Sequence, residues 1–136
     1  MSEAWIIDAA RTPRGVGKQG KGALWEVHPQ KLLSSVLKPL AERNHINTDE
    51  IDDVIVSCST QFQKQGSCIG RMGALDAGFS TKASGMTLDR FCGGGITSVN
   101  LAAANIMSGM EDLVVAGGVE MMSYTPVSYT HLRAHE

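Results

Sequence analysis

The sequence contains only three cysteines and no long hydrophobic run among its 136 residues. An odd number of cysteines without paired spacing argues against a disulfide framework and is typical of a reducing compartment. No apolar stretch approaches the ~20 residues that are needed to cross a bilayer. The N-terminus has neither the basic start of a signal peptide nor the Arg- and Ser-rich composition of a transit peptide. We therefore expect a cytoplasmic protein without a membrane partner.

The sequence also lacks a strong excess of charge, because its formal net charge is −2. This gives no electrostatic reason to expect nucleic acid as a partner. The basic stretch of Arg11, Arg14, Lys18 and Lys21 is interpreted as a solvated loop, with a phosphate contact as the lesser alternative. The hydrophobic fraction of 43% and the charged fraction of 19% are typical of a globular protein. The length predicts one domain.

Short apolar runs alternate with helical patterns along the chain. The runs predict buried strands at Ala4–Ala10 and Asp53–Ser59 and an apolar strand at Asp112–Gly117, and Thr87–Phe91 is a short candidate strand that leads into Cys92. Helical patterns follow Pro29 and cover Ile69–Ala77 and Gly95–Met110, and a loop is predicted at Arg11–Gly22. Strands that alternate with helices indicate an α/β protein with a mainly parallel sheet and helices on its faces.

Two of the predicted helices have distinctive sequences. Pro39 lies inside the first one, where it should remove a backbone hydrogen bond and kink the helix. The helix over Gly95–Met110 gathers apolar side chains on one face, namely Ile96, Val99, Ala103, Ile106 and Met110. In the chain on its own, we expect part of that face to remain exposed.

The candidate chemistry centres on Cys92. A predicted strand ends, the cysteine follows, and three glycines lead into a helix. The thiolate is the nucleophilic form of cysteine, and a helix N-terminus favours it through partial positive charge and free N–H groups. The same groups can stabilise an oxyanion at an attacked thioester carbonyl. In an open α/β sheet, ligands bind beyond the C-terminal ends of the strands, which is where Cys92 is expected.

Other interpretations of the cysteines are open at this point. A lone cysteine is more often a small buried hydrophobic residue than a nucleophile. The glycines that follow Cys92 can equally serve close packing or bind a phosphate. Cys58 lies in an apolar run and Cys68 has no evident activating partner, so we expect both to be buried structural residues.

The segment around Cys92 resembles the active-site motif of the thiolases. The matching positions are Leu88, Cys92, Gly93, Gly95, Ile96, Ser98, Val99 and Ile106. Two positions depart from the motif, because Asp89 stands where Asn, Ser or Thr is usual and Gly94 where Ser or Thr is usual. The chain start, Ile7–Pro13, is similar to the family's opening strand and loop, and Gly117–Ser123 to its glycine-rich stretch. The family's segment before the active site is matched by Gly66, Gly70, Arg71 and Gly78.

The resemblance spans Ala4–Pro126 and implies a thiolase-like fold, of which residues 1–126 would form an incomplete N-terminal βαβαβ-type half. Residues 127–136 do not follow the pattern, and we interpret them as a foreign or disordered tail. His131 and His135 in that tail are four apart, but without a third ligand they predict no metal site. Neither these two nor His28 and His45 match a thiolase catalytic position.

The resemblance also implies acyl transfer, with Cys92 taking an acyl group from an acyl-CoA and its backbone N–H helping to hold the carbonyl oxygen. A histidine and a second cysteine would come from the family's second half. Acyl-CoA and CoA would be substrates, with no resident cofactor or metal, and the full-length protein would form homodimers or homotetramers. Substrate-binding residues stay unassigned.

Two alternatives remain. A ketoacyl-synthase-type condensing enzyme shares the fold, but the matches at Ile7–Pro13 and Gly117–Ser123 disfavour it. A non-catalytic thiolase-like protein that binds CoA or lipid would have no need of the thiol of Cys92.

Overall fold

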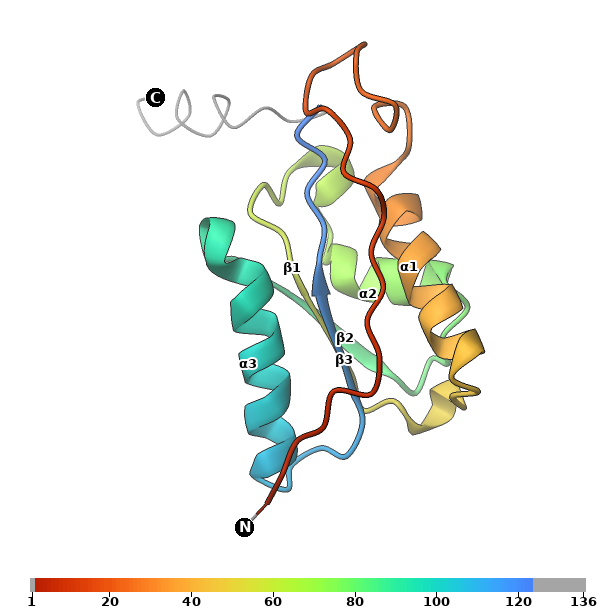
Figure 1. Ribbon diagram of the computed structural model, residues 1–136, viewed down its shortest axis with the longest axis vertical. Helices are drawn as coiled ribbons and strands as arrows, with labels where there is room; N and C mark the ends of the chain where they lie inside the picture. The colour runs from red at the N-terminus through yellow and green to blue at the C-terminus, as the bar shows by residue number, and fades with distance from the viewer. Residues whose placement is uncertain (1, 124–136) are drawn as a thin grey trace.

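Three parallel strands form the sheet at the centre of the computed structural model, which describes residues 2–123 (Figure 1). They are β1 (Asp53–Ser57), β2 (Ser84–Leu88) and β3 (Val114–Gly118), in the order β2-β1-β3. Asp53 pairs with Ser84 and Val114, and Ser57 pairs with Leu88 and Gly118, so the three strands end in register. β1 is therefore the central strand, and the predicted parallel α/β arrangement is confirmed for the described residues.

Helices cover both faces of the sheet, as Figure 1 shows. The helices α1 (Pro29–Arg43) and α2 (Ile69–Asp76) pack against each other on one side. The helix α3 (Gly94–Met107) lies on the other side, against β1 and β3. Short 3-10 turns at Thr48–Glu50, Gln63–Gln65 and Phe91–Gly93 complete the described elements. Parallel strands need such cover, because both of their faces are apolar.

The main core lies between the sheet and the α1–α2 pair. Val54, Val56 and Cys58 are buried there, and the alternation along β1 turns Ile55 and Ser57 toward α3. The helices contribute Leu33 and Leu37 from α1 and Ile69 and Ala74 from α2. The core is thus one-sided, and α3 contributes little to it.

The start of α1 follows from local sequence. The Nδ1 atom of His28 accepts a hydrogen bond from the Gln30 backbone N–H at 3.1 Å, and Pro29 occupies the first turn, where its missing N–H costs nothing. The predicted opening of the helix at Pro29 is confirmed. The helix continues without a break through the exposed Pro39 to Arg43.

The other predicted elements shift by a few residues. β1 ends at Ser57 rather than Ser59, α2 ends at Asp76, and α3 begins one residue earlier than predicted. The strand predicted at Thr87–Phe91 is β2, which begins at Ser84 and ends at Leu88. The strand does not reach Phe91, because Arg90, with a ψ of 42°, and Phe91, with a φ of 45°, both leave the extended region.

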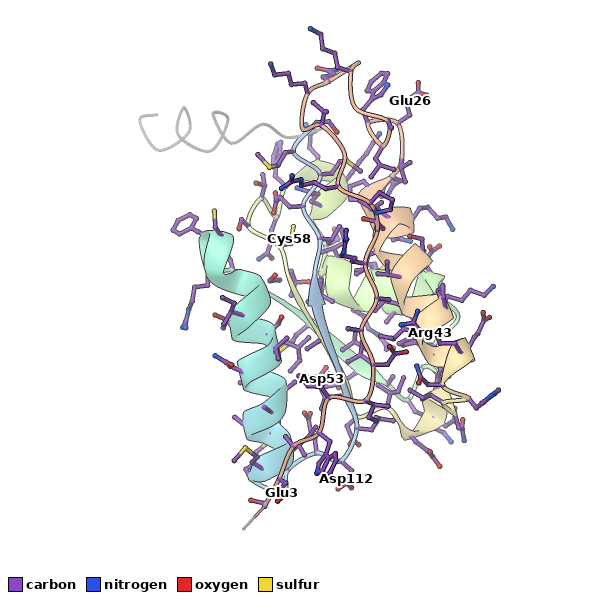
Figure 2. All side chains as sticks on the ribbon, viewed as in Figure 1. Glu3, Glu26, Arg43, Asp53, Cys58 and Asp112 are labelled. Atoms are coloured by element: carbon purple, nitrogen blue, oxygen red, sulfur yellow. The ribbon has the colours of Figure 1, made fainter. Side chains whose placement is uncertain are left out.

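The prediction of a buried strand at Ala4–Ala10 is wrong for this structure. The segment pairs with none of the described strands, and Trp5 and Ile6 are each 80% exposed. Side chains hold it instead: Arg43, labelled in Figure 2, donates from Nε to Asp8 Oδ2 at 2.6 Å and from Nη2 to the Ala9 carbonyl at 2.7 Å. An apolar run is buried only where a partner strand and a covering layer meet it, and the described chain supplies neither here.

Candidate functional site

The site lies where the three strands end together. Ser57, Leu88 and Gly118 are aligned at the C-terminal edge of the sheet, and the segments that follow them meet there. Figure 1 shows the N-terminal end of α3 at this same end of the molecule. Ligands of open parallel sheets bind at this edge, because the connecting loops leave a crevice beyond the strand ends.

Cys92 is exposed and lies in the turn Phe91–Gly93, immediately before α3. The carboxylate of Asp89 holds this turn, because its Oδ1 accepts a hydrogen bond from the Phe91 N–H at 2.8 Å. The Gly93 N–H donates to the Arg90 carbonyl at 3.1 Å and closes the turn. Asp89 departs from the thiolase motif, yet as an acceptor it serves a turn that Asn or Ser also supports.

The backbone before Cys92 is strained. Phe91 has a φ of 45°, a conformation that bulky residues seldom adopt, and its side chain is 78% exposed. Residues in this region cost on the order of 1–3 kcal/mol and cluster at functional sites. The strain places the Cys92 side chain at a sharp turn between strand and helix.

The helix α3 points its N-terminus at this turn without a side-chain cap, and the Gly94 N–H donates to the Phe91 carbonyl. The unpaired N–H groups of a first helical turn carry partial positive charge, which favours an anion beside them. A thiolate on Cys92, or an oxygen that gains negative charge when the thiolate attacks, is such an anion. The geometry therefore supports nucleophilic chemistry at Cys92.

Small residues seat α3 on the sheet. Gly94, Ser98 and Ala102 form its buried face, and the Ser98 hydroxyl donates to the Gly117 carbonyl at 2.9 Å. The larger side chains lie elsewhere on the helix: Ile96 is 72% exposed and Val99 is 41% exposed. This agrees with the expectation that part of the apolar face of the helix remains uncovered in the chain alone.

Cys58 follows β1 and is 2% exposed (Figure 2). Burial, together with the charge of Glu120, raises the pKa of its thiol to about 12. The thiol therefore stays protonated at neutral pH, and the structural role predicted for Cys58 agrees with this placement.

The expected burial of Cys68 is wrong. This residue is exposed and precedes α2 with a φ of 55°. Its Sγ lies 3.7 Å from the Gly85 carbonyl oxygen and 3.7 Å from the Thr87 hydroxyl. The sequence pattern placed it near a helix start but could not show that the left-handed conformation turns it outward.

A polar network that the sequence did not reveal joins the segments after β1 and β3. Gln65 is fully buried and donates from Nε2 to the Thr60 carbonyl at 2.9 Å and to Glu120 Oε1 at 3.2 Å. Its Oε1 accepts from the Met121 N–H at 2.6 Å, and Glu120 Oε2 accepts from the Ser59 N–H at 2.9 Å. Partners more than fifty residues apart in sequence leave no local signal, so only the fold reveals this network.

The basic stretch lies apart from Cys92 in the chain. Arg11, Arg14 and Lys18 line a cleft of about 830 Å³ together with residues of α1 and the segment after β3. Their side chains are exposed, which fits the interpretation as a solvated loop. Among residues 2–123, no cluster of three or more His, Cys, Asp or Glu could hold a metal ion. None of the helices described is long and apolar enough to cross a membrane.

The described residues thus form an α/β fold with a parallel sheet covered on both faces and an exposed cysteine in a turn at a helix N-terminus. The chain belongs to the thiolase family: the model of the thiolase N-terminal domain matches residues 4–136. That range includes residues 127–136, which lie outside the described structure, as do His131 and His135.

Relatives and solved structures agree with this assignment. The chain is 41% identical over 128 residues to a steroid 3-ketoacyl-CoA thiolase of Mycobacterium tuberculosis, covering 94% of this chain and 31% of the relative. It is 41% identical over 127 residues to the 3-oxoadipyl-CoA/3-oxo-5,6-dehydrosuberyl-CoA thiolase of Escherichia coli, covering 93% and 31%. The crystal structure of a Bacillus anthracis acetyl-CoA acetyltransferase matches with a TM-score of 0.73 and 37% identity, over 81% of this chain and 27% of that one. The chain thus spans about a third of the length of these curated relatives.

Proposed function

We propose that the protein to which this chain contributes is an acyltransferase that moves acyl groups between CoA thioesters through a covalent acyl-Cys92. The single observation that carries the proposal is the exposed thiol of Cys92 at the N-terminus of α3, on the C-terminal edge of the sheet. The thiolase names of the relatives support the reaction class.

In the thiolytic direction, the Cys92 thiolate attacks the keto carbon of a 3-ketoacyl-CoA. The carbon–carbon bond beside that carbon breaks, and its electron pair leaves with the acetyl-CoA fragment, which takes up a proton. The acyl group stays on Sγ as a thioester until the thiol of a second CoA attacks it, loses its proton and releases Cys92. Claisen condensation of acetyl-CoA is the same sequence in reverse.

The first turn of α3 and the Cys92 backbone N–H are proposed to stabilise the oxygen that becomes negative during each attack. Preorganised N–H donors at such an oxyanion lower the barrier, and removal of one donor typically costs on the order of 10²–10³ in rate. Coenzyme A acts here as a substrate, and the proposal includes neither a resident cofactor nor a metal.

The general base is proposed to come from outside residues 2–123. His28 caps α1 and His45 follows the end of the same helix, on the face of the sheet opposite α3. A histidine and a second cysteine from the second half of the enzyme are proposed to complete the site, as the thiolase resemblance implies. Homodimers or homotetramers are proposed for the full-length protein, as the resemblance implies.

The test is Cys92→Ala in the full-length parent protein. We expect thiolysis of acetoacetyl-CoA and covalent labelling by radioactive acetyl-CoA to be lost, while circular dichroism remains that of the parent. Cys68→Ala is the matched control, because this thiol is exposed and also precedes a helix, and it should retain activity. Substantial turnover by Cys92→Ala would show that Cys92 is not the nucleophile.

The same labelling experiment separates the two alternatives. A non-catalytic CoA- or lipid-binding protein would bind acetyl-CoA without forming an acid-stable adduct on Cys92. A ketoacyl-synthase-type enzyme would form the adduct but would not return the acyl group to free CoA. The proposed acyltransferase would form the adduct on Cys92 and would also return the acyl group to free CoA.

A further inference from the structure

Ser57 lies directly beneath the first turn of α3. It is the last residue of the central strand β1 and pairs with Leu88 on one side and Gly118 on the other. Its neighbours Val56 and Cys58 are buried in the core with α1 and α2, so the Ser57 side chain points to the opposite face. That face carries the start of α3, two residues after Cys92.

The space around Ser57 leaves no room for a side chain at Gly94. A Cβ atom on Gly94 would lie 2.6 Å from the Ser57 Cβ and 3.0 Å from its Oγ. Because the Ser57 Cβ is fixed by the backbone, no rotation of the hydroxyl relieves this contact. A Cβ atom on Gly118 would meet mainly the Ser57 Oγ, at 2.5 Å, and that atom can rotate away.

We propose that Ser57 and Gly94 form a sterically coupled pair that sets how closely the first turn of α3 seats on β1, and thereby positions Cys92. Ser57 is a positioning residue in this pair and acts through Gly94. Gly94 departs from the thiolase motif, and Ser57 gives the physical reason: the serine on β1 occupies the space that a side chain at position 94 would need. The chemical role of Cys92 itself rests on the proposed function.

The coupling matters because the field of a helix N-terminus is short-ranged. Its effect on an anion falls off within the first turn, so a shift of the α3 start relative to β1 changes the stabilisation of the Cys92 thiolate. Misplacement of reacting groups by about 1 Å can cost on the order of 10²-fold in rate. A side chain at position 94 therefore lowers the reactivity of the Cys92 thiol without contacting that residue.

The experiment measures alkylation of Cys92 by iodoacetamide as a function of pH in the full-length parent, with peptides quantified by mass spectrometry. Gly94→Ala should lower the Cys92 rate constant about tenfold at neutral pH. Adding Ser57→Gly, which removes the Cβ, should restore the rate to within about threefold of the parent. Adding Ser57→Ala instead, which keeps the Cβ, should not restore it.

The buried Cys58 serves as an internal reporter of general unfolding, because it reacts only when the core opens. Equal Cys92 reactivity in Gly94→Ala and the parent would overturn the coupling, and so would equal rescue by Ser57→Ala and Ser57→Gly. Faster alkylation of Cys58 in Gly94→Ala would assign the effect to loss of the fold and would also overturn it. If Cys92→Ala retains turnover, the proposed function fails, whereas the alkylation rates still decide the coupling.

Discussion

Three cysteines of this chain differ in burial and setting, although none is part of a disulfide. Cys92 and Cys68 are exposed and precede helices, whereas Cys58 is buried and follows β1 directly in the chain. The helix that follows Cys92 has 14 residues, and the helix that follows Cys68 has 8. The Cys68 Sγ lies 3.7 Å from both the Gly85 carbonyl oxygen and the Thr87 hydroxyl, so the two exposed thiols need not be equally reactive.

We expect iodoacetamide to modify Cys92 first, Cys68 second and Cys58 last in the folded parent near neutral pH. The order follows from exposure and from the helix N-terminus behind Cys92, whereas burial holds the pKa of Cys58 at about 12. Timed alkylation followed by mass spectrometry of the three peptides gives the order. Preferential labelling of Cys58 would contradict it.

The raised pKa of the Cys58 thiol predicts that the folded protein loses stability at alkaline pH. Its pKa is raised in the folded state from 9.0 to about 12, so its contribution to stability is complete below pH 9 and is lost as pH rises toward 12. The free energy of unfolding of the parent should therefore fall over this window more steeply than that of Cys58→Ala. Urea titrations at several pH values measure the difference, and parallel curves for the two proteins would refute the assignment.

At the level of elements, a polar link ties α1 to α2. Asp76 at the end of α2 accepts hydrogen bonds from the partly buried hydroxyl of Ser34 and from Lys31, both at 2.5 Å. Both hydrogen bonds lower the pKa of the Asp76 carboxyl, and the bond from Lys31 has the larger effect. The link is therefore complete above the ordinary carboxyl pKa of 3.8 and is lost as pH falls below it.

Asp76→Asn should lower the thermal midpoint of the parent at pH 7, and the difference from the parent should shrink as pH falls below about 4. Lys38→Ala is the matched control, because its exposed pair with Glu42 spans 3.9 Å within α1 and should contribute little. Differential scanning calorimetry at several pH values measures both. An Asp76→Asn midpoint no lower than that of Lys38→Ala would show that the link does not stabilise the α1–α2 pair.

At the scale of the whole molecule, apolar side chains remain uncovered in the described structure. Ile96 and Val99 are exposed on α3, Phe91 stands beside Cys92, and Trp5 and Ile6 project from the N-terminal segment. Both outer strands, β2 and β3, also end the described sheet without a further partner. Contiguous apolar patches beyond a few hundred Å² favour association.

We therefore expect the 136-residue chain, expressed alone, to associate and to lack thiolysis. Light scattering after size-exclusion chromatography, near-UV circular dichroism and a thiolysis assay test this directly. Ile96→Glu should increase the monomer fraction by charging the exposed face of α3, whereas Ile55→Glu, in the buried part of β1, should abolish folding. A monodisperse chain with cooperative unfolding and measurable thiolysis would contradict the prediction.

Local patterns were sufficient for most of the elements. Val54, Ile55 and Val56 form an apolar run that is buried on both faces, and Pro29 marks a helix start through its own covalent geometry. Such signals depend on neighbouring residues only, so they can be read without the fold. The turn at Cys92 was placed in the same way, from a cysteine followed by glycines and a helical pattern.

The sequence by itself therefore determined the α/β alternation, the position of Cys92 before α3 and the thiolase resemblance. Only the tertiary structure decided that Ala4–Ala10 stays unpaired, that Cys68 faces outward, that Gln65 joins Glu120, and that Ser57 fills the space beside Gly94. The physical reason is range: propensity and periodicity act over a few residues, whereas pairing, burial and steric exclusion depend on atoms that the fold brings together from distant positions.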